Sequence, residues 1–140
     1  MEVSDVMTPN PERAEVTETV REALLKLTEM DIRHLPIVEE GQLVGMISDR
    51  DLREVVVPMV SDLELAAATV DSRFERPVSE LMTGDVISVH PETDISEVIE
   101  MMIDHRVGAM PVVEPSTLAL VGIISYIDIL REAEELFMGL

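Results

Sequence analysis

Residues 43–51 read Leu43-Val44-Gly45-Met46-Ile47-Ser48-Asp49-Arg50-Asp51, and residues 120–128 read Leu120-Val121-Gly122-Ile123-Ile124-Ser125-Tyr126-Ile127-Asp128. Each stretch opens with an apolar run that is typical of a buried strand, and each closes on Ser-x-x-Asp, which is typical of a helix start. A strand that runs directly into a helix, twice in one chain, predicts an α/β (α+β) fold built by duplication.

The duplication extends outward from these stretches. The segment Val3–Thr8 returns 75 residues later as Val78–Thr83, and Pro36–Glu39 returns as Pro111–Glu114. At this displacement residues 3–39 give eight identities, and residues 43–53 give six more after a two-residue insertion. We therefore divide the chain into repeat 1 (residues 1–56), an ordered connecting segment (57–77, with an Ala66–Ala68 run) and repeat 2 (78–140).

The same order of elements is predicted in each repeat. A helix starts at Thr17 or Thr19 in repeat 1 and at Thr93 or Asp94 in repeat 2, because these side chains are good N-caps. Two short strands and a further helix, after Ser48 or Ser125, complete a β-α-β-β-α unit. The apolar helix stripes are Val20, Ala23, Leu24, Leu27 and Met30, and Ile95, Val98, Ile99, Met102 and Ile103; the strands are 35–38, 43–47, 110–113 and 118–124.

Composition narrows the classes of partner. The chain has 140 residues, 46% of them hydrophobic, and 29 acidic against 10 basic residues give a formal charge of −19. Such a surface repels phosphate backbones and anionic lipids, so we expect neither nucleic acid nor membrane as a partner. With no apolar run of about 20 residues and no signal-like N-terminus, we expect a cytoplasmic protein. Cysteine is absent, which excludes thiol nucleophiles and thiolate zinc sites.

The repeated Ser-x-x-Asp has two readings. A hydroxyl and free N–H groups at a helix N-terminus attract an anion such as phosphate, and an ionised Asp accepts hydrogen bonds from ribose hydroxyls. The same four residues also make a capping box, in which Ser and Asp only satisfy backbone donors. A single copy of the motif would favour the capping box. Because the motif occurs twice at equivalent places in the two repeats, both the capping box and the ligand site remain open interpretations.

The ordered set of motifs resembles the cystathionine-β-synthase (CBS) domain. The resemblance rests on Met-Thr, Ile32–Val38 and 43–52 in the first copy, and on 105–113 and 122–125 in the second. Two such domains in tandem are called a Bateman module. This resemblance, to the stand-alone type of CBS-pair protein, implies two repeats packed with pseudo-two-fold symmetry through their sheets. It further implies adenosine-containing ligands (AMP, ADP, ATP, S-adenosylmethionine) in the clefts between the repeats.

The resemblance also assigns roles in the first cleft. It implies that Asp51 holds the ribose hydroxyls, that Ser48 binds phosphate, and that Arg33 and His34 add phosphate contacts, with Arg50 as a further donor. Adenine contacts are implied for Thr83, Ile87 and Val107. We expect no aromatic platform, since Trp is absent and the aromatic residues are only Tyr126, Phe74 and Phe137.

The second cleft would use Asp128 and Ser125, with Thr8, Glu12 and Ile32 on the opposing wall. It lacks three basic residues, because Gly108, Ala109 and Ile127 replace Arg33, His34 and Arg50. A charge-assisted hydrogen bond contributes about 1.5–3 kcal/mol. We therefore expect the second cleft to be weak, empty or selective for a less anionic adenosyl ligand.

These observations favour a regulatory module that senses an adenosine nucleotide and modulates an unidentified protein on another chain. The alternatives are a dimeric scaffold with weak or no ligand binding, and an S-adenosylmethionine sensor. We expect no enzyme, no resident metal and no catalytic cofactor; the acidic surplus leaves carboxylates for a magnesium ion that accompanies ATP. We expect a homodimer, and the C-terminal stripe of Ile129, Leu130, Ala133, Leu136 and Phe137 packs either on its own domain or on a second subunit.

Overall fold

The computed structural model describes residues 1–60 and 72–139, without the side chains of 55–60. The Ala66–Ala68 run and most of the connecting segment predicted over 57–77 lie outside the described residues. The chain forms two compact units: unit 1 is Met1–Pro11, Gly41–Leu43 and Ile87–Leu140, and unit 2 is Glu12–Glu40 and Val44–Val86. Each unit therefore combines segments from both repeats.

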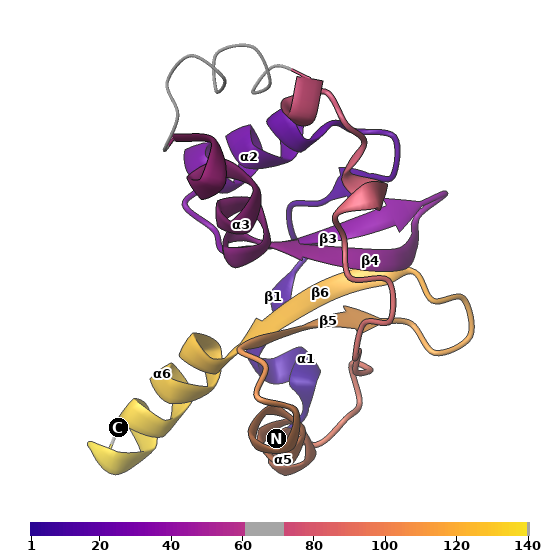
Figure 1. Ribbon diagram of the computed structural model, residues 1–140. Coiled ribbons are helices and arrows are strands. Elements are labelled where there is room, and N and C mark those ends of the chain that lie inside the picture. The colour runs from indigo at the N-terminus through magenta and orange to yellow at the C-terminus, as the bar shows by residue number, and fades with distance from the viewer. Residues whose placement is uncertain (61–71, 140) are drawn as a thin grey trace. The chain divides into compact units, whose positions relative to one another are not determined.

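Unit 2 has a three-stranded sheet with the strand order β2-β3-β4. Strand β2 is parallel to β3, and helices α2 and α3 lie on one side of the β3–β4 sheet (Figure 1). The elements are β2 (Ala14–Glu15), α2 (Val20–Glu29), β3 (His34–Glu39), β4 (Gln42–Ser48, in unit 2 from Val44), α3 (Asp49–Val60) and the 3₁₀ helix η1 (Val78–Glu80).

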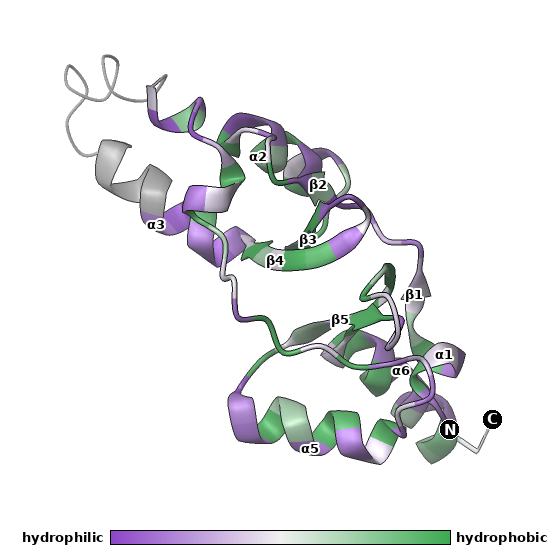
Figure 2. Ribbon diagram, turned by 90° about the vertical axis from the view of Figure 1, so that its right-hand side faces the viewer, coloured by the Kyte–Doolittle hydropathy of each residue, from purple (hydrophilic) through white to green (hydrophobic). Residues whose placement is uncertain are grey.

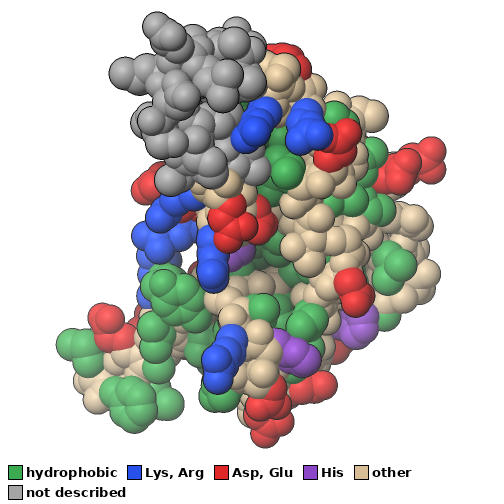
Figure 3. Space-filling model, in the orientation of Figure 1, with side chains coloured by type: hydrophobic (Ala, Val, Ile, Leu, Met, Phe, Trp, Pro, Cys, Tyr) green, Lys and Arg blue, Asp and Glu red, His purple; other side chains and the backbone are tan. Residues whose placement is uncertain are grey.

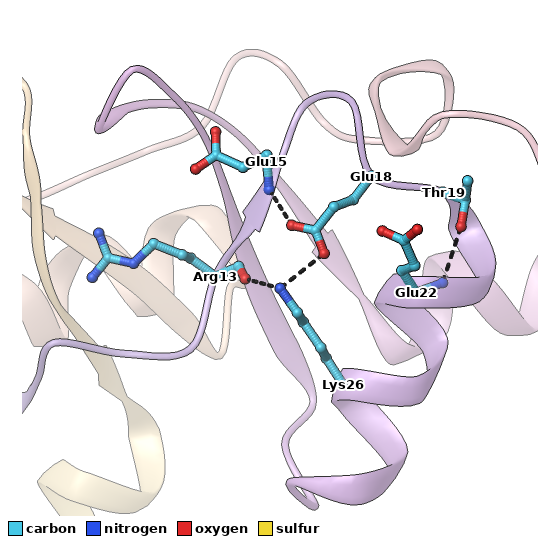
Figure 4. Close-up of polar contacts among 6 residues, drawn as sticks. All are labelled: Arg13, Glu15, Glu18, Thr19, Glu22 and Lys26. Atoms are coloured by element: carbon cyan, nitrogen blue, oxygen red, sulfur yellow. Dashed lines mark hydrogen bonds and ion pairs between the residues drawn. The ribbon is translucent and has the colours of Figure 1, made fainter.

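A polar network ties the start of α2 to strand β2 (Figure 4). The Glu18 carboxylate accepts a 2.5 Å hydrogen bond from the Glu15 N–H and lies 2.9 Å from Lys26 Nζ. Lys26 Nζ also donates a 2.6 Å hydrogen bond to the carbonyl of Arg13. Because Lys26 lies in the last turn of α2, these bonds hold the helix against the segment that leads into strand β2.

Unit 1 has a second three-stranded sheet with the order β1-β6-β5, in which both pairings are antiparallel. Helices α1 and α5 lie on one side of this sheet, and α6 extends from the end of β6 (Figure 1). The elements are α1 (Val3–Val6), β1 (Thr8–Pro9), α5 (Ile95–His105), β5 (Ala109–Val113), β6 (Leu120–Ser125) and α6 (Tyr126–Phe137).

Each Met-Thr segment joins the sheet of the other repeat. Thr8 of repeat 1 pairs with Ile123 of β6, and Thr83 of repeat 2 forms an antiparallel bridge with Met46 of β4. The family resemblance assigned Thr83 to the first cleft and Thr8 to the second, and these backbone pairings agree with that exchange. The segments end up beside the strands that lead into the two Ser-x-x-Asp motifs.

The α/β prediction is confirmed, and the predicted helices and paired strands are present; the first strand predicted for repeat 2 is reduced to an isolated bridge between Val89 and Val112. Thr19 and Asp94 are the N-caps of α2 and α5, each accepting a hydrogen bond from a backbone N–H of the first turn. The strand predicted over 118–124 begins only at Leu120, because Leu118 is in the left-handed region (φ 62°) and its N–H donates to the carbonyl of Glu114 in a turn.

Two apolar clusters form the cores of the units, and the strands that supply them are largely hydrophobic (Figure 2). The prediction of broad buried helix stripes is correct only in part, because Met30, Ile99 and Ile103 are exposed. Unit 2 buries Ala14, Val20, Ala23, Leu27, Leu35, Ile37, Ile47, Leu52 and Val78, and unit 1 buries Val3, Val89, Val98, Met102, Met110, Val112 and Ile124.

Helix α6 leaves an apolar face in solvent. None of its residues is fully buried, and Leu136 and Phe137 are 76% and 86% exposed. Hydrophobic side chains gather over this helix at the lower left of Figure 3. The predicted stripe therefore does not bury itself on its own unit, apart from Ile129, which packs partly against the core. Among the described residues, no helix has the length and hydrophobicity to cross a bilayer.

Candidate functional site

The Ser48 motif forms a complete capping box at the start of α3. The Ser48 N–H donates to Asp51 Oδ2 over 2.9 Å, and the Asp51 N–H donates to Ser48 Oγ over 3.1 Å. The Ser-x-x-Asp motif therefore does form the capping box that its sequence predicts. It uses one carboxylate oxygen only, since Oδ1 of Asp51 accepts no hydrogen bond from the described residues. The half-buried Asp51 keeps an acceptor for a ligand hydroxyl.

Strand β3 brings basic residues to the same place. The Asp49 N–H donates to the carbonyl of Arg33 over 2.8 Å, which joins the start of β3 to the start of α3. Arg33 is exposed and makes no ion pair with any residue in the described ranges. Its guanidinium is available to an anion at this edge of the sheet.

His34 is half-buried beside the two carboxylates. Burial lowers the pKa of His34 below its usual value of 6.5. The Asp51 carboxylate opposes this shift, the Arg33 guanidinium adds to it, and the Asp49 carboxylate opposes it more weakly. His34 therefore lies within electrostatic range of the Ser48 motif, and an approaching phosphate would favour its protonated form.

Arg50 lies on the exposed side of α3. Its side chain is 89% exposed and its Nε lies 3.9 Å from the Glu54 carboxylate, one turn along the helix. An exposed pair of this kind contributes little to stability and exchanges readily with other partners. Arg50 thus lies within the motif, but its side chain takes no part in the hydrogen bonds between Ser48 and Asp51.

Thr83 completes this group of residues in unit 2. The Met46 N–H donates to the Thr83 carbonyl over 3.0 Å, and the Thr83 N–H donates to the Met46 carbonyl over 2.9 Å. Gly45 allows this approach, because a Cβ there would overlap the Met82 side chain and lie 3.1 Å from the Thr83 oxygen. We call Arg33, His34, Ser48, Arg50, Asp51 and Thr83 the first half-site. Ile87 and Val107, also predicted for this cleft, belong to unit 1 and pack against its core.

Unit 1 contains the matching motif. The Ser125 N–H donates to Asp128 Oδ2 over 2.9 Å, the Ser125 hydroxyl lies 3.1 Å from the same oxygen, and the Asp128 N–H donates to Ser125 Oγ over 3.3 Å. Thr8 lies beside Ile123, and a Cβ at Gly122 would lie 3.1 Å from the Thr8 carbonyl oxygen. We call Thr8, Gly108, Ala109, Ser125, Tyr126, Ile127 and Asp128 the second half-site.

Two residues predicted for the second cleft lie in unit 2. Glu12 is exposed, and Ile32 is half-buried and packs against the core of that unit.

The second half-site contains an aromatic ring that the sequence reasoning missed. The Tyr126 N–H donates to the Gly108 carbonyl over 2.9 Å, and the ring lies 3.3 Å from where a Cβ on Gly108 would be. The expectation of no aromatic platform was made for adenine in the first cleft, and it stays a prediction there. The available signal was the replacement of Asp49 by Tyr126 together with that of Arg33 by Gly108, at matched positions of the repeat.

Acidic side chains do not gather into an ion site in the described part of the chain. No group of three or more Asp, Glu or His residues there has the arrangement needed to hold a metal.

The chain matches the model of the CBS domain over residues 3–58 and again over 78–135. A solved Vibrio cholerae protein, provisionally named an acetoin utilization protein (AcuB), is 34% identical with a TM-score of 0.77, and the match covers 99% of this chain and 93% of that one.

Two further solved structures hold adenosine ligands. The CBS domain pair of protein MJ0100, in complex with 5′-methylthioadenosine and S-adenosyl-L-methionine, is 29% identical with a TM-score of 0.75, over 99% of this chain and 97% of that one. CBSX2 from Arabidopsis thaliana, in complex with AMP, is 26% identical with a TM-score of 0.77, over 96% of this chain and 97% of that one.

Four curated relatives have enzyme names, but this chain spans only 15% to 22% of their length. Their names therefore describe proteins of which this chain matches only a small part. Two matches to one family model, together with CBS pairs as structural relatives, are decisive: the chain belongs to the CBS domain family, of which it carries two domains in tandem.

Proposed function

We propose that this chain is a non-catalytic regulatory module that binds an adenosine nucleotide of the AMP, ADP or ATP class at the first half-site. The observation that carries the proposal is the cluster of Arg33, His34, Ser48 and Asp51 around one helix N-terminus. The cluster offers cations for a phosphate and a carboxylate oxygen for a ribose hydroxyl, which are the two polar parts of a nucleotide.

The proposal assigns a role to each side chain. The free oxygen of Asp51 accepts from the ribose, while Arg33, His34 and the N–H groups at the start of α3 hold the phosphate. Arg50 adds a long-range positive charge, and the exposed Thr83 lines the adenine side. The AMP complex of a CBS-pair relative supports this ligand class.

We propose that the module works as a homodimer. The exposed apolar residues on α5 and α6 would otherwise face water, and a second copy would cover them. Binding of the nucleotide would favour one arrangement of the module and so alter a regulated protein on another chain.

A scaffold role is the second candidate, because the capping boxes account for both Ser-x-x-Asp motifs without a ligand. Isothermal titration calorimetry of the nucleotide-stripped protein with AMP, ADP and ATP, with and without magnesium, separates the two functions. Saturable binding that is lost in Asp51→Ala supports the nucleotide module. If no nucleotide gives binding heat or thermal stabilisation, the result supports the scaffold role instead.

A further inference from the structure

The methionine of each Met-Thr segment lays its sulfur on a glycine of the strand that the segment joins. A Cβ at Gly45 would overlap Sδ of Met82 and lie 2.9 Å from its Cγ. A Cβ at Gly122 would overlap Sδ of Met7 and lie 3.2 Å from its Cγ. The same contact therefore occurs once in unit 2 and once in unit 1. We call these two pairs the sulfur–glycine contacts.

In unit 2 the sulfur–glycine contact lies beside the backbone bonds that join the segment to its sheet. Thr83, the residue after Met82, exchanges two backbone hydrogen bonds with Met46, the residue after Gly45. Strand β4 reaches Ser48 two residues later. A change at the Met82 sulfur therefore acts directly on the strand that leads into the first capping box.

Unit 1 repeats this arrangement. Thr8, the residue after Met7, pairs with Ile123, the residue after Gly122. Strand β6 reaches Ser125 two residues later. The duplication has thus kept a thioether at the same place in both units, although other side chains around the two motifs differ.

Partial exposure separates these two methionines from most of the others. Met7 and Met82 are half-buried and pack against the cores of unit 1 and unit 2. The chain has ten methionines and no cysteine, so thioethers are its only oxidisable sulfur groups. An oxidant that reaches Met7 or Met82 therefore changes a packing contact. Other methionines are either buried in the cores or exposed at the surface: Met46, Met102 and Met110 are buried, and Met1, Met30 and Met138 are exposed.

We propose that Met82 and Met7 are oxidation-sensitive sites, and that their conversion to methionine sulfoxide releases the Met-Thr segments from strands β4 and β6. The oxidant is a peroxide such as hydrogen peroxide. The thioether sulfur attacks one peroxide oxygen and bonds to it, the O–O bond breaks, and the other oxygen leaves as water. The sulfur loses two electrons, which the peroxide gains, and methionine sulfoxide reductases reverse the change.

The sulfoxide does not fit the sulfur–glycine contact. Oxidation adds an oxygen atom to a sulfur that already touches glycine backbone, and overpacking of this kind displaces its neighbours. The new oxygen is also a strong hydrogen-bond acceptor placed among apolar side chains, where it lacks a donor. In unit 2 the segment should therefore move away from β4, which weakens the two hydrogen bonds between Thr83 and Met46.

The consequence for ligand binding rests on the proposed function, because Thr83 belongs to the first half-site. Oxidation of Met82 should weaken AMP about three- to tenfold, the effect of one lost hydrogen bond. Oxidation of Met7 should leave the AMP affinity within about twofold, because this sulfur lies in the other unit. The module would then report peroxide and nucleotide together.

The test treats the full chain with hydrogen peroxide as wild type, Met82→Leu, Met7→Leu and the double variant. Leucine conserves the volume of methionine and has no sulfur to oxidise. Peptide mass spectrometry gives the sulfoxide fraction at each methionine, thermal melting gives stability, and titration calorimetry gives the AMP affinity. Oxidation at the exposed Met1, Met30 and Met138 is common to all four proteins and serves as the internal control.

We expect peroxide to lower the melting temperature of wild type by at least about 3 °C and to weaken AMP. The double variant should keep its melting temperature, and Met82→Leu alone should keep its AMP affinity. Met7→Leu, the matched control, should still lose AMP affinity on oxidation. Methionine sulfoxide reductases should restore the oxidised wild type, a result that needs no variant.

The outcomes separate this inference from the proposed function. It is overturned if Met7 and Met82 stay reduced while the exposed methionines are oxidised, if full oxidation at both sites leaves the melting temperature unchanged, or if the double variant is destabilised as much as wild type. Failure of the reductases to restore the melting temperature also overturns it. If untreated protein binds no AMP, the proposed function fails, and the melting temperatures still decide the role of the two methionines.

Discussion

Replacing the two motif aspartates in parallel separates capping from ligand binding. Asp51→Ala and Asp128→Ala each remove the acceptor of a 2.9 Å hydrogen bond from the N-cap N–H, of Ser48 or Ser125. Loss of such a cap costs about 1 kcal/mol. Because the two capping boxes have nearly the same geometry, both variants should lose similar stability, which lowers the melting temperature by about 3–5 °C in a chain of this size.

The effect on nucleotide affinity should differ between the two variants. A hydrogen bond to a charged group contributes about 1.5–3 kcal/mol. The loss of the Asp51 contact to ribose should therefore weaken the binding of AMP by about 10- to 100-fold. Asp128→Ala should leave the AMP affinity within about threefold, because its half-site lacks the cations that hold phosphate. Calorimetry gives the affinities and thermal melting gives the stabilities of the same samples.

The matched design makes the reasoning refutable. If Asp128→Ala abolishes AMP binding and Asp51→Ala leaves it unchanged, the ranking of the half-sites is wrong. If both variants lose stability equally and AMP still binds as in wild type, the two carboxylates are helix caps and not ligand contacts. Asp51→Asn, which retains an acceptor for the cap without the charge, shows which property the nucleotide requires.

Three further predictions follow from the geometry. Burial lowers the pKa of His34, so its stabilising contribution is complete above about pH 6.5 and is lost as the pH falls through the lower folded-state pKa. An NMR titration of His34 should give a midpoint below 6.5, and this midpoint should fall further in Asp51→Ala because the Asp51 carboxylate raises the pKa. A midpoint that is the same in Asp51→Ala would contradict the electrostatic interaction between His34 and Asp51. Gly45→Ala should lower the free energy of unfolding, measured in denaturant, by about 1–3 kcal/mol, because its Cβ would overlap the side chain of Met82. Gly84→Ala is the matched control and should have little effect, because a Cβ at Gly84 would have no atom within 4 Å. Phe137→Glu should shift the protein from dimer to monomer in sedimentation with its melting temperature little changed, since this side chain is 86% exposed; a wild type that sediments as a monomer would refute the dimer.

The sequence alone determined the local features. The duplication, the N-caps Thr19 and Asp94, and the strand that runs into Ser48 were all predictable, because caps and hydrophobic periods depend on neighbours within a few residues. The limit of local reasoning is seen at Leu118. Its apolar side chain continues the strand pattern, but its backbone is in the left-handed region and forms a turn.

The tertiary structure decided which distant segments meet. Thr83 lies beside Met46 and Thr8 beside Ile123, and the ring of Tyr126 lies on Gly108. Periodicity predicts the faces of a helix or strand, but it contains no information on which segment pairs with a given strand. For that reason the sequence could indicate the basic residues near Ser48 and their absence at the matched positions near Ser125, and only the folded chain showed which backbone segments and which aromatic ring lie beside the two motifs.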